Sequence, residues 1–128
     1  MFKKYNPNPK GKEVGDCVVR ALCCAFNQPW DVVYTTLCKV GLELKCMPNE
    51  KESYSALIEN SGFKRYSMPK ATKGSSRTTA GEFARTHKEG TYILKLANHI
   101  VCCKNGVLYD LWDCSDSCVY TYWKNEKK

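Results

Sequence analysis

The sequence predicts an α+β domain in which N-terminal helices pack on a C-terminal, mostly antiparallel sheet. Helical periodicity dominates the chain up to Gly90, because apolar residues recur every three or four positions. After Gly90 the pattern changes to short segments rich in β-branched and aromatic residues. The dipeptide Asn105-Gly106, the strongest short signal for a hairpin, joins two of these segments. Helices followed by paired strands define the α+β class.

Capping and terminating residues set the limits of the expected helices. Asp16 is a favourable N-cap residue, Pro29 fits the first turn of a helix, and Asn49 can cap another. Gly41 and Gly62 are typical residues for ending a helix. The predicted helices therefore cover residues 17–27, 29–41, 50–61 and 78–87.

The remaining segments are predicted to be an arm, two connections and strands. Residues 5–15 hold two Asn-Pro pairs and two glycines, which is typical of an extended, turn-rich arm. Residues 42–48 predict a connector, and residues 69–77, rich in Lys, Ser and Gly, predict a surface loop. Strands are expected at residues 63–68, 91–96, 99–103, 107–112 and 118–123.

Length and composition indicate a single domain over residues 1–128. The 128 residues are 43% hydrophobic and 26% charged, which is ordinary for a globular protein. No apolar run suits a membrane span or a signal peptide, so we expect no membrane partner and a cytoplasmic location. The net charge of +7 lies largely near the two ends, which we expect to be solvated and partly frayed. Nucleic acid is therefore not the expected partner.

The nine cysteines are expected to be mostly free thiols. Their number is odd, and Cys23-Cys24 and Cys102-Cys103 are adjacent pairs that suit small apolar side chains in a reducing compartment. A metal-binding module is the alternative, but no Cys-x-x-Cys occurs and adjacent cysteines are poorly spaced for chelation. Its thiolates would come from Cys23, Cys24, Cys38, Cys46, Cys114 and Cys118. We expect no metal and no cofactor.

Cys17 is the candidate nucleophile. It falls in the first turn of the first predicted helix, where unpaired backbone N–H groups and the helix dipole favour a thiolate. The thiolate is the reactive form of cysteine in nucleophilic catalysis. A second stretch, residues 98–110, can supply a base and a carboxylate that orients it.

His99 is the candidate base, and the expected hairpin selects its carboxylate partner. A two-residue turn at Asn105-Gly106 places Val101 opposite Asp110, so His99 and Asp110 share one face of the sheet as diagonal neighbours. Asp113 then points to the other face. A register change of one residue or a bulge would reverse this choice, so Asp113 stays open as the alternative.

Two stretches resemble known cysteine peptidases. Residues 15–21, Gly-Asp-Cys-x-x-Arg-Ala, are similar to the nucleophile motif Asp-Gly-Asn-Cys-x-x-Arg-Ala of ovarian-tumour-type deubiquitinases. Residues 99–110, with His-x-Val, a hairpin and Tyr-Asp, resemble the histidine half of papain-like peptidases, including bacteriocin-processing peptidases. The chain also resembles small phage and bacterial proteins that open with Tyr-Asn-Pro-Asn-Pro and end near Tyr-Asp-x-Trp-Asp.

The resemblance implies a papain-like fold and a cysteine hydrolase that cleaves a peptide, isopeptide or side-chain amide bond through an acyl-enzyme. It implies Cys17 as nucleophile, His99 as general base and acid, and Asp110 as the orienting residue, with a protein or peptide substrate. Papain-like enzymes place an oxyanion-hole glutamine ahead of the cysteine, where this chain has Gly11. The Asn8 amide is the candidate for that role here.

The alternative function is a phage- or bacterium-encoded binding or inhibitor protein on a papain-like scaffold with an unused site. Exposed aromatic residues on an edge strand, Tyr120, Tyr122 and Trp123, would suit such a surface. Packing of the same side chains against the helices is the competing interpretation.

Overall fold

The computed structural model describes residues 1–69 and 77–126 of the chain. Within these residues the chain is α+β, as predicted, with four helices and one six-stranded sheet. The helices are α1 (Cys17–Phe26), α2 (Trp30–Leu44), α3 (Lys51–Asn60) and α4 (Ala80–Thr86). The strands are β1 (Phe2–Lys4), β2 (Phe63–Ser67), β3 (Thr91–Leu96), β4 (His99–Lys104), β5 (Val107–Asp110) and β6 (Thr121–Asn125).

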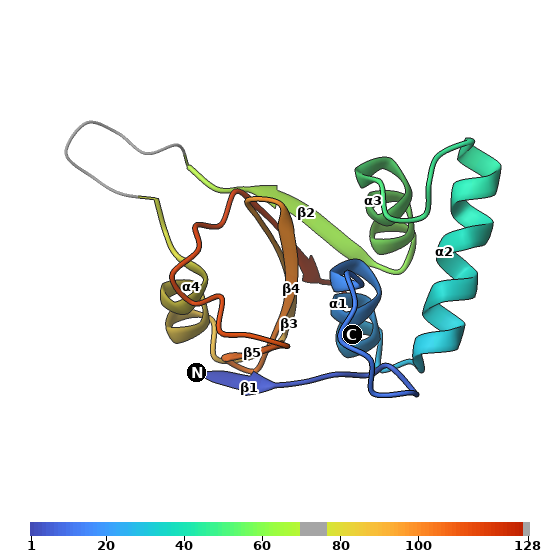
Figure 1. Cartoon of the computed structure of the whole chain (residues 1–128). Helices are drawn as coiled ribbons and strands as arrows, with labels where there is room; N and C mark the ends of the chain where they lie inside the picture. The colour runs from blue at the N-terminus through green and yellow to red at the C-terminus, as the bar shows by residue number, and fades with distance from the viewer. Residues whose placement is uncertain (70–76, 127–128) are drawn as a thin grey trace.

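The sheet separates two helical layers. Its strand order is β1-β5-β4-β3-β6-β2, and every pairing except that of β1 with β5 is antiparallel. Helices α1, α2 and α3 lie on one side of the sheet and α4 lies on the other (Figure 1). None of the described helices is both long enough and apolar enough to cross a membrane.

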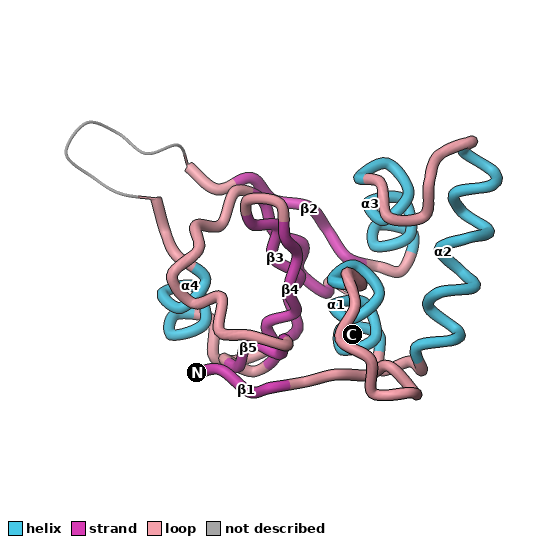
Figure 2. The backbone as a smooth tube through the Cα atoms, viewed as in Figure 1, coloured by secondary structure: helices cyan, strands magenta, loops and turns pink. Residues whose placement is uncertain are grey.

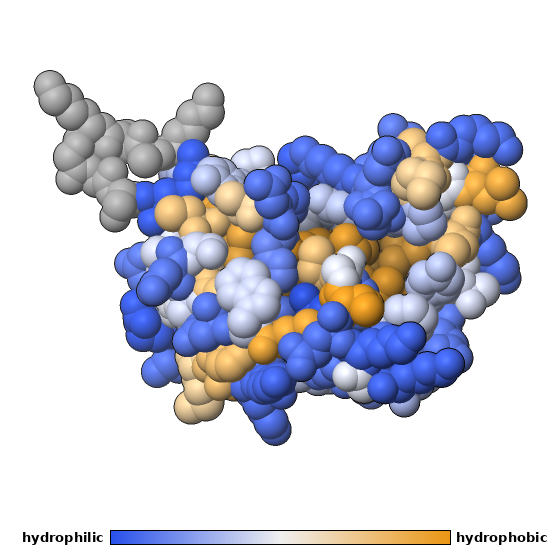
Figure 3. Space-filling model, viewed as in Figure 1, coloured by the Kyte–Doolittle hydropathy of each residue, from blue (hydrophilic) through white to orange (hydrophobic). Residues whose placement is uncertain are grey.

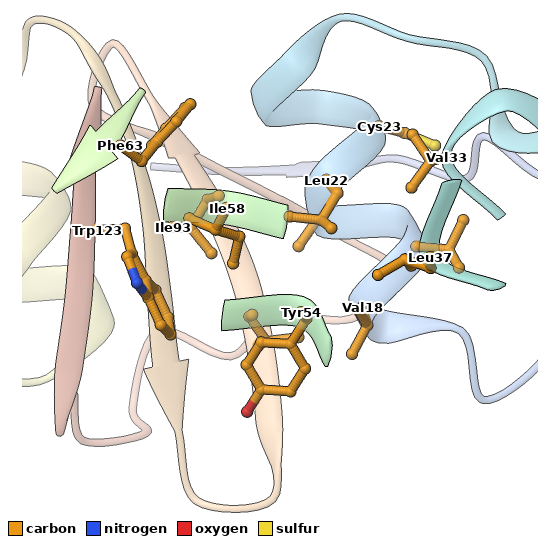
Figure 4. Close-up of a cluster of buried hydrophobic side chains, with 13 residues drawn as sticks. Val18, Leu22, Cys23, Val33, Leu37, Tyr54, Ile58, Phe63, Ile93 and Trp123 are labelled. Carbon is orange, nitrogen blue, oxygen red and sulfur yellow. The ribbon is translucent and has the colours of Figure 1, made fainter. Parts of the chain in front are cut away.

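Helix α1 is the centre of the larger hydrophobic core. Its buried face packs between the sheet and the other two helices, so that one apolar layer joins all of them (Figure 4). This layer includes Val18 and Leu22 of α1, Leu37 of α2, Tyr54 and Ile58 of α3, and Ile93 and Trp123 of the sheet. The packing fixes α1 against β4, and thereby fixes the start of the helix relative to the sheet.

A second core lies between the sheet and α4. The loop from β5 to β6 crosses this helix (Figure 2), where the Gly81 N–H donates to the Ser115 carbonyl at 2.9 Å. Buried side chains from α4, from the sheet and from this loop fill the space, and they include Phe83, Leu94 and Val119. The loop after β5 is therefore held in place although it has no regular structure.

The β4–β5 hairpin has the predicted register. Cys103 pairs with Leu108 and Lys104 with Val107, and both turn residues have positive φ, 50° for Asn105 and 79° for Gly106. A type I′ turn requires this conformation at both positions. Strand β5 ends at Asp110, two residues before the predicted end.

The start of the chain is ordered, which corrects the prediction of a frayed end. Phe2–Lys4 forms β1, which runs parallel to β5 and places Lys4 opposite Asp110. The Tyr5 N–H continues this contact by donating to the Asp110 carbonyl at 2.8 Å. Local pattern did not predict this strand because its pairing depends on a segment about one hundred residues away.

Helix α2 is longer than predicted, and Gly41 does not end it. The helix continues to Leu44, and Lys45 adopts the left-handed conformation that closes it. Gly41 is needed for close packing, because a Cβ there would lie 2.6 Å from the Cys46 carbonyl oxygen. The N-cap of α3 is likewise Glu50 and not Asn49.

The aromatic residues near the end of the chain do not form an exposed edge. Strand β6 lies between β3 and β2, and its Trp123 is fully buried in the larger core. Tyr122 packs against the second core, and only Tyr120, which precedes the strand, is exposed. The packing interpretation is therefore confirmed for Trp123 and Tyr122, and the docking surface expected from these side chains is wrong.

Candidate active site

Cys17 is the first residue of α1 and is half-buried. Its position at the helix N-terminus is the predicted one, and the N–H groups of the first turn have no partners within the helix. Because α1 packs on β4, the thiol faces the start of that strand. The backbone N–H of Ile100 and the imidazole of His99 both lie close enough to the sulfur to lower the pKa of the thiol.

His99 is the first residue of β4 and lies between Cys17 and Asp110. The tight turn before it places Asn98 in the left-handed conformation, with φ of 51°. Its Nε2 atom is 2.5 Å from Oδ2 of Asp110, and Cys17 is among the neighbours that raise the pKa of the imidazole. The structure therefore brings the predicted nucleophile, base and carboxylate together.

Asp110 is the carboxylate that meets the imidazole. It ends β5 and is 0% exposed, and its second oxygen, Oδ1, accepts from Arg20 Nε at 2.9 Å and from the Leu111 N–H at 2.8 Å. Asp113 is exposed and instead accepts hydrogen bonds from the backbone N–H and the hydroxyl of Ser115. The Asp113 alternative left open by the sequence is not the arrangement in the structure.

A buried network of charged side chains holds Asp110 in position. Arg20 is 3% exposed and donates from Nη1 to Asp16 Oδ1 at 2.6 Å as well as from Nε to Asp110. The indole of Trp30 donates to the other Asp16 oxygen at 2.9 Å. Asp16 therefore occupies the N-cap position but does not cap α1 with its side chain, which corrects the capping role predicted for that carboxylate.

The surroundings favour charge separation between Cys17 and His99. Burial alone would raise the pKa of Cys17, but the His99 hydrogen bond and charge, the Ile100 N–H and Arg20 together lower it. Burial likewise opposes protonation of His99, but hydrogen bonds to Asp110, Cys114 and Cys17 raise its pKa to about 11. Both shifts favour a thiolate beside an imidazolium.

A cleft of about 610 Å³ opens onto Cys17 and His99. Apolar residues gather in the central hollow of the molecular face drawn in Figure 3. Helix α2 supplies an aromatic wall, in which the rings of Trp30 and Tyr34 stack with centroids 4.9 Å apart. The other walls include Leu37, Tyr54 and Ile100, with polar groups from Asn49, Lys95 and Asn98. A substrate with an apolar group fits this lining.

Asn8 does not lie where the sequence analysis expected an oxyanion-hole side chain. Its Oδ1 atom accepts from the Lys10 N–H at 2.9 Å, and Asn8 is not among the described residues that line the cleft. Asn98, next to the histidine, does line it. The arm before α1 forms turns that its own Asn side chains stabilise. The number of residues between Asn8 and Cys17 does not reveal this geometry.

The hairpin register that pairs Val101 with Asp110 also predicts Trp112 opposite His99, and the Trp112 ring lies over the imidazole with centroids 4.6 Å apart. Other residues around the site were not identified from the sequence. Cys114 is buried, and its sulfur belongs to the group of atoms around His99 and Asp110 that lie within 4.8 Å of one another. Arg20 could be noticed because it belongs to the Cys-x-x-Arg motif. Nothing in the sequence indicated that it pairs with Asp16 and Asp110. No sequence pattern distinguished Lys95, near the end of β3, from a surface lysine.

Within the described residues, one group has the composition of a metal site, namely His99, Asp110 and Cys114, whose ligand atoms lie within 4.8 Å of one another. Of the thiols considered for a metal module it includes only Cys114. The Arg20 guanidinium already occupies Oδ1 of Asp110, and its charge opposes a divalent cation there. The donor set therefore suits a hydrogen-bonded imidazole–carboxylate pair better than a metal ion.

Comparison of the chain with protein-family models, with curated proteins and with solved structures gives no match.

Proposed function

We propose that the protein is a cysteine hydrolase of the papain-like type that acts on a peptide, isopeptide or side-chain amide bond. One observation carries the proposal: a buried carboxylate, Asp110, holds the His99 imidazole beside a thiol at a helix N-terminus. Cys17 and His99 line an open cleft, and Asp110 supports the imidazole from the buried interior. The order of the parts, a cysteine helix followed by a histidine strand and a carboxylate strand, supports the papain-like assignment.

Each residue of the site has a defined task in the proposed reaction. The Cys17 thiolate attacks the amide carbonyl carbon, which forms an S–C bond and places the carbonyl electron pair on oxygen. Collapse of this intermediate expels the amine, which takes its proton from the His99 imidazolium. Water then attacks the thioester with His99 as base, which releases the acid and restores the thiolate and imidazolium pair.

Asp110 and the helix start assist these steps without forming bonds to the substrate. Because Nε2 of His99 is bound to Asp110, Nδ1 is the nitrogen left to exchange protons with sulfur and substrate. The backbone N–H of Cys17 would stabilise the oxyanion, with the amide of Asn98, which lines the cleft, as the candidate side-chain donor. All nine cysteines are free thiols, which is compatible with the proposed cytoplasmic location.

The proposal is tested with p-nitrophenyl acetate, an activated ester that acylates catalytic thiols. We expect a burst of about one nitrophenolate per protein molecule, an acetyl adduct mapped to Cys17, and slower turnover afterwards. Cys17→Ser should abolish the burst, and His99→Gln should suppress turnover of any adduct that forms. Cys46→Ser, a change at another accessible thiol, should leave both phases unchanged. Acetylation spread over several thiols without a burst would contradict the proposal.

A further inference from the structure

Lys95 places a positive charge inside the cleft. It is the last residue but one of β3, where it pairs with Ile100 of β4 and with Thr121 of β6. Its side chain lines the cleft, and its charge interacts with that of Cys17. The ammonium group donates to the Leu96 carbonyl at 2.7 Å, which anchors it near the reacting sulfur.

The carboxylates of the described residues leave this charge without an acidic partner. Asp16 is the acidic residue of the cleft lining, and both of its oxygens are engaged, by Arg20 and by Trp30. The ion pairs found in the described part of the chain do not include Lys95. The imidazolium of His99 is matched by Asp110. The anion that interacts with Lys95 is the Cys17 thiolate, whose charge is lost when the sulfur bonds to a substrate.

The surroundings of Lys95 increase its attraction for an anion. The side chain is partly buried among apolar residues, and this burial lowers the pKa of the ammonium group. A cation that has lost part of its hydration gains more from a bound anion than a fully solvated surface lysine does. The carboxylate, a compact oxygen anion, matches an ammonium group that has three donors.

We propose that Lys95 is a specificity-determining residue that binds a carboxylate of the substrate close to the scissile bond. The aromatic wall of Trp30 and Tyr34 holds an apolar side chain of the same substrate. The preferred substrate is thus an amide that carries both an apolar group and a carboxylate. This inference rests on the proposed hydrolase function, because it assigns a substrate class to the same site.

Alkylation of Cys17 by two small reagents tests the proposal without knowledge of the natural substrate. Iodoacetate carries a carboxylate and iodoacetamide does not, and with both the thiolate displaces iodide from the CH₂ group. The ratio of the two rates at Cys17 therefore measures attraction of a carboxylate to the cleft. We expect Lys95→Gln to lower the iodoacetate-to-iodoacetamide ratio about fivefold. Lys95→Arg, which keeps the charge, should retain the ratio.

The control is Lys124→Gln, which removes an exposed lysine from β6 of the same sheet and should not change the ratio. If iodoacetamide labels Cys17 fast but Lys95→Gln does not change the iodoacetate-to-iodoacetamide ratio, the carboxylate inference is overturned and the hydrolase proposal stays intact. Slow iodoacetamide labelling of Cys17 in the unaltered protein overturns the hydrolase proposal itself. A normal ratio in Lys95→Arg shows that loss in Lys95→Gln arises from charge and not from misfolding.

The carboxylate has two sources in peptides, a free C-terminus or an acidic side chain. The two sources are distinguished by how strongly short peptides protect Cys17 from iodoacetamide. The peptides contain Phe followed by Gly or Asp, and each ends in either a carboxylate or an amide. Stronger protection by the free C-terminus, or by the Asp side chain, identifies the source, and Lys95→Gln should abolish that advantage. Equal protection by acidic and neutral peptides overturns the inference.

Discussion

Arg20 donates from Nε to Oδ1 of Asp110 at 2.9 Å, although the two residues are 90 positions apart in the chain. This contact connects the helix that begins at Cys17 to the carboxylate that holds His99. Both partners are almost fully buried, so water does not replace the interaction when one of them is removed. The geometry of the candidate site therefore depends on an ion pair that does not itself touch the cleft.

Arg20→Met should destabilise the protein strongly. It leaves the buried Asp16 carboxylate without a cation and the buried Asp110 carboxylate with His99 alone. Removal of one partner of a buried ion pair typically costs about 3–5 kcal/mol. The measurement is the free energy of unfolding from urea titration. Lys4→Met is the control, because the Lys4–Glu13 pair is 3.8 Å apart with side chains 65% and 62% exposed, and its loss should cost less than about 1 kcal/mol. Equal costs for the two variants would contradict this account.

Substitution of the two candidate carboxylates should give different results. Asp110→Asn removes the charge that raises the pKa of His99, so this pKa should fall and the pKa of Cys17 should rise. Asp113→Asn should change neither, because Asp113 binds Ser115 in an exposed loop. NMR titration of His99 and the pH dependence of Cys17 alkylation measure both effects. Larger shifts in Asp113→Asn would reverse the assignment.

The candidate site also determines how stability depends on pH. His99 has a raised folded-state pKa, so it adds stability that is complete below its ordinary value of 6.5 and is lost as the pH rises toward about 11. Cys17 has a lowered pKa, so it adds stability that is complete above its ordinary value of 9.0 and is lost as the pH falls. Between about pH 7 and 9 the two contributions change in opposite directions.

Cys17→Ala should expose the His99 contribution. Its free energy of unfolding in the presence of reductant should fall more steeply than that of the unaltered protein from pH 7 to 9, by up to about 1.4 kcal/mol per pH unit. Cys23→Ala is the matched control in the same helix, because burial, with the charges of Asp16 and Cys24, raises the Cys23 pKa to about 12. Its profile should run parallel to the unaltered one. A parallel profile for Cys17→Ala would indicate that the thiol is not ionised in the folded protein.

Thiol reactivity should single out Cys17 among nine cysteines. Iodoacetamide at pH 6 should label it about tenfold faster than any other thiol, because alkylation requires the thiolate. Cys46 is the informative comparison: it is also accessible, but desolvation and the Glu52 and Glu50 carboxylates raise its pKa. Peptide mapping by mass spectrometry gives the order of labelling. Comparable rates at Cys17 and Cys46 would show that the site does not activate its thiol.

The parts of the site that were predicted from the sequence depend on local geometry. The Asn105-Gly106 turn sets the register of its own hairpin, and alternation along the strands then places Asp110 near His99. Cys17 is similar, because the start of a helix depends on neighbouring residues. Short stretches of sequence contain this information, and distant contacts did not override it.

The parts that were not predicted depend on which distant side chains meet. Asp16 has the residue type of an N-cap, but a buried guanidinium and the Trp30 indole bind its carboxylate more strongly than the helix N–H groups do. Cys114 lies near the imidazole in an irregular loop whose path follows its contacts with α4. Gly41 has the residue type of a helix end, but the close approach of Cys46 explains it. Such contacts have no periodicity to detect.

The pairing of β1 with β5 has a consequence for folding kinetics. Phe2 lies opposite Leu108, and Cys17 meets its base only when β4 docks on α1, so both contacts close loops of most of the chain length. Contacts of such sequence separation slow folding, because the entropy of the closed loop is lost before the contact is gained. Selective reactivity of Cys17 should therefore return late during refolding from urea. Until the native topology forms, Cys17 would react no faster than the other thiols. The activated nucleophile would appear only with the native fold.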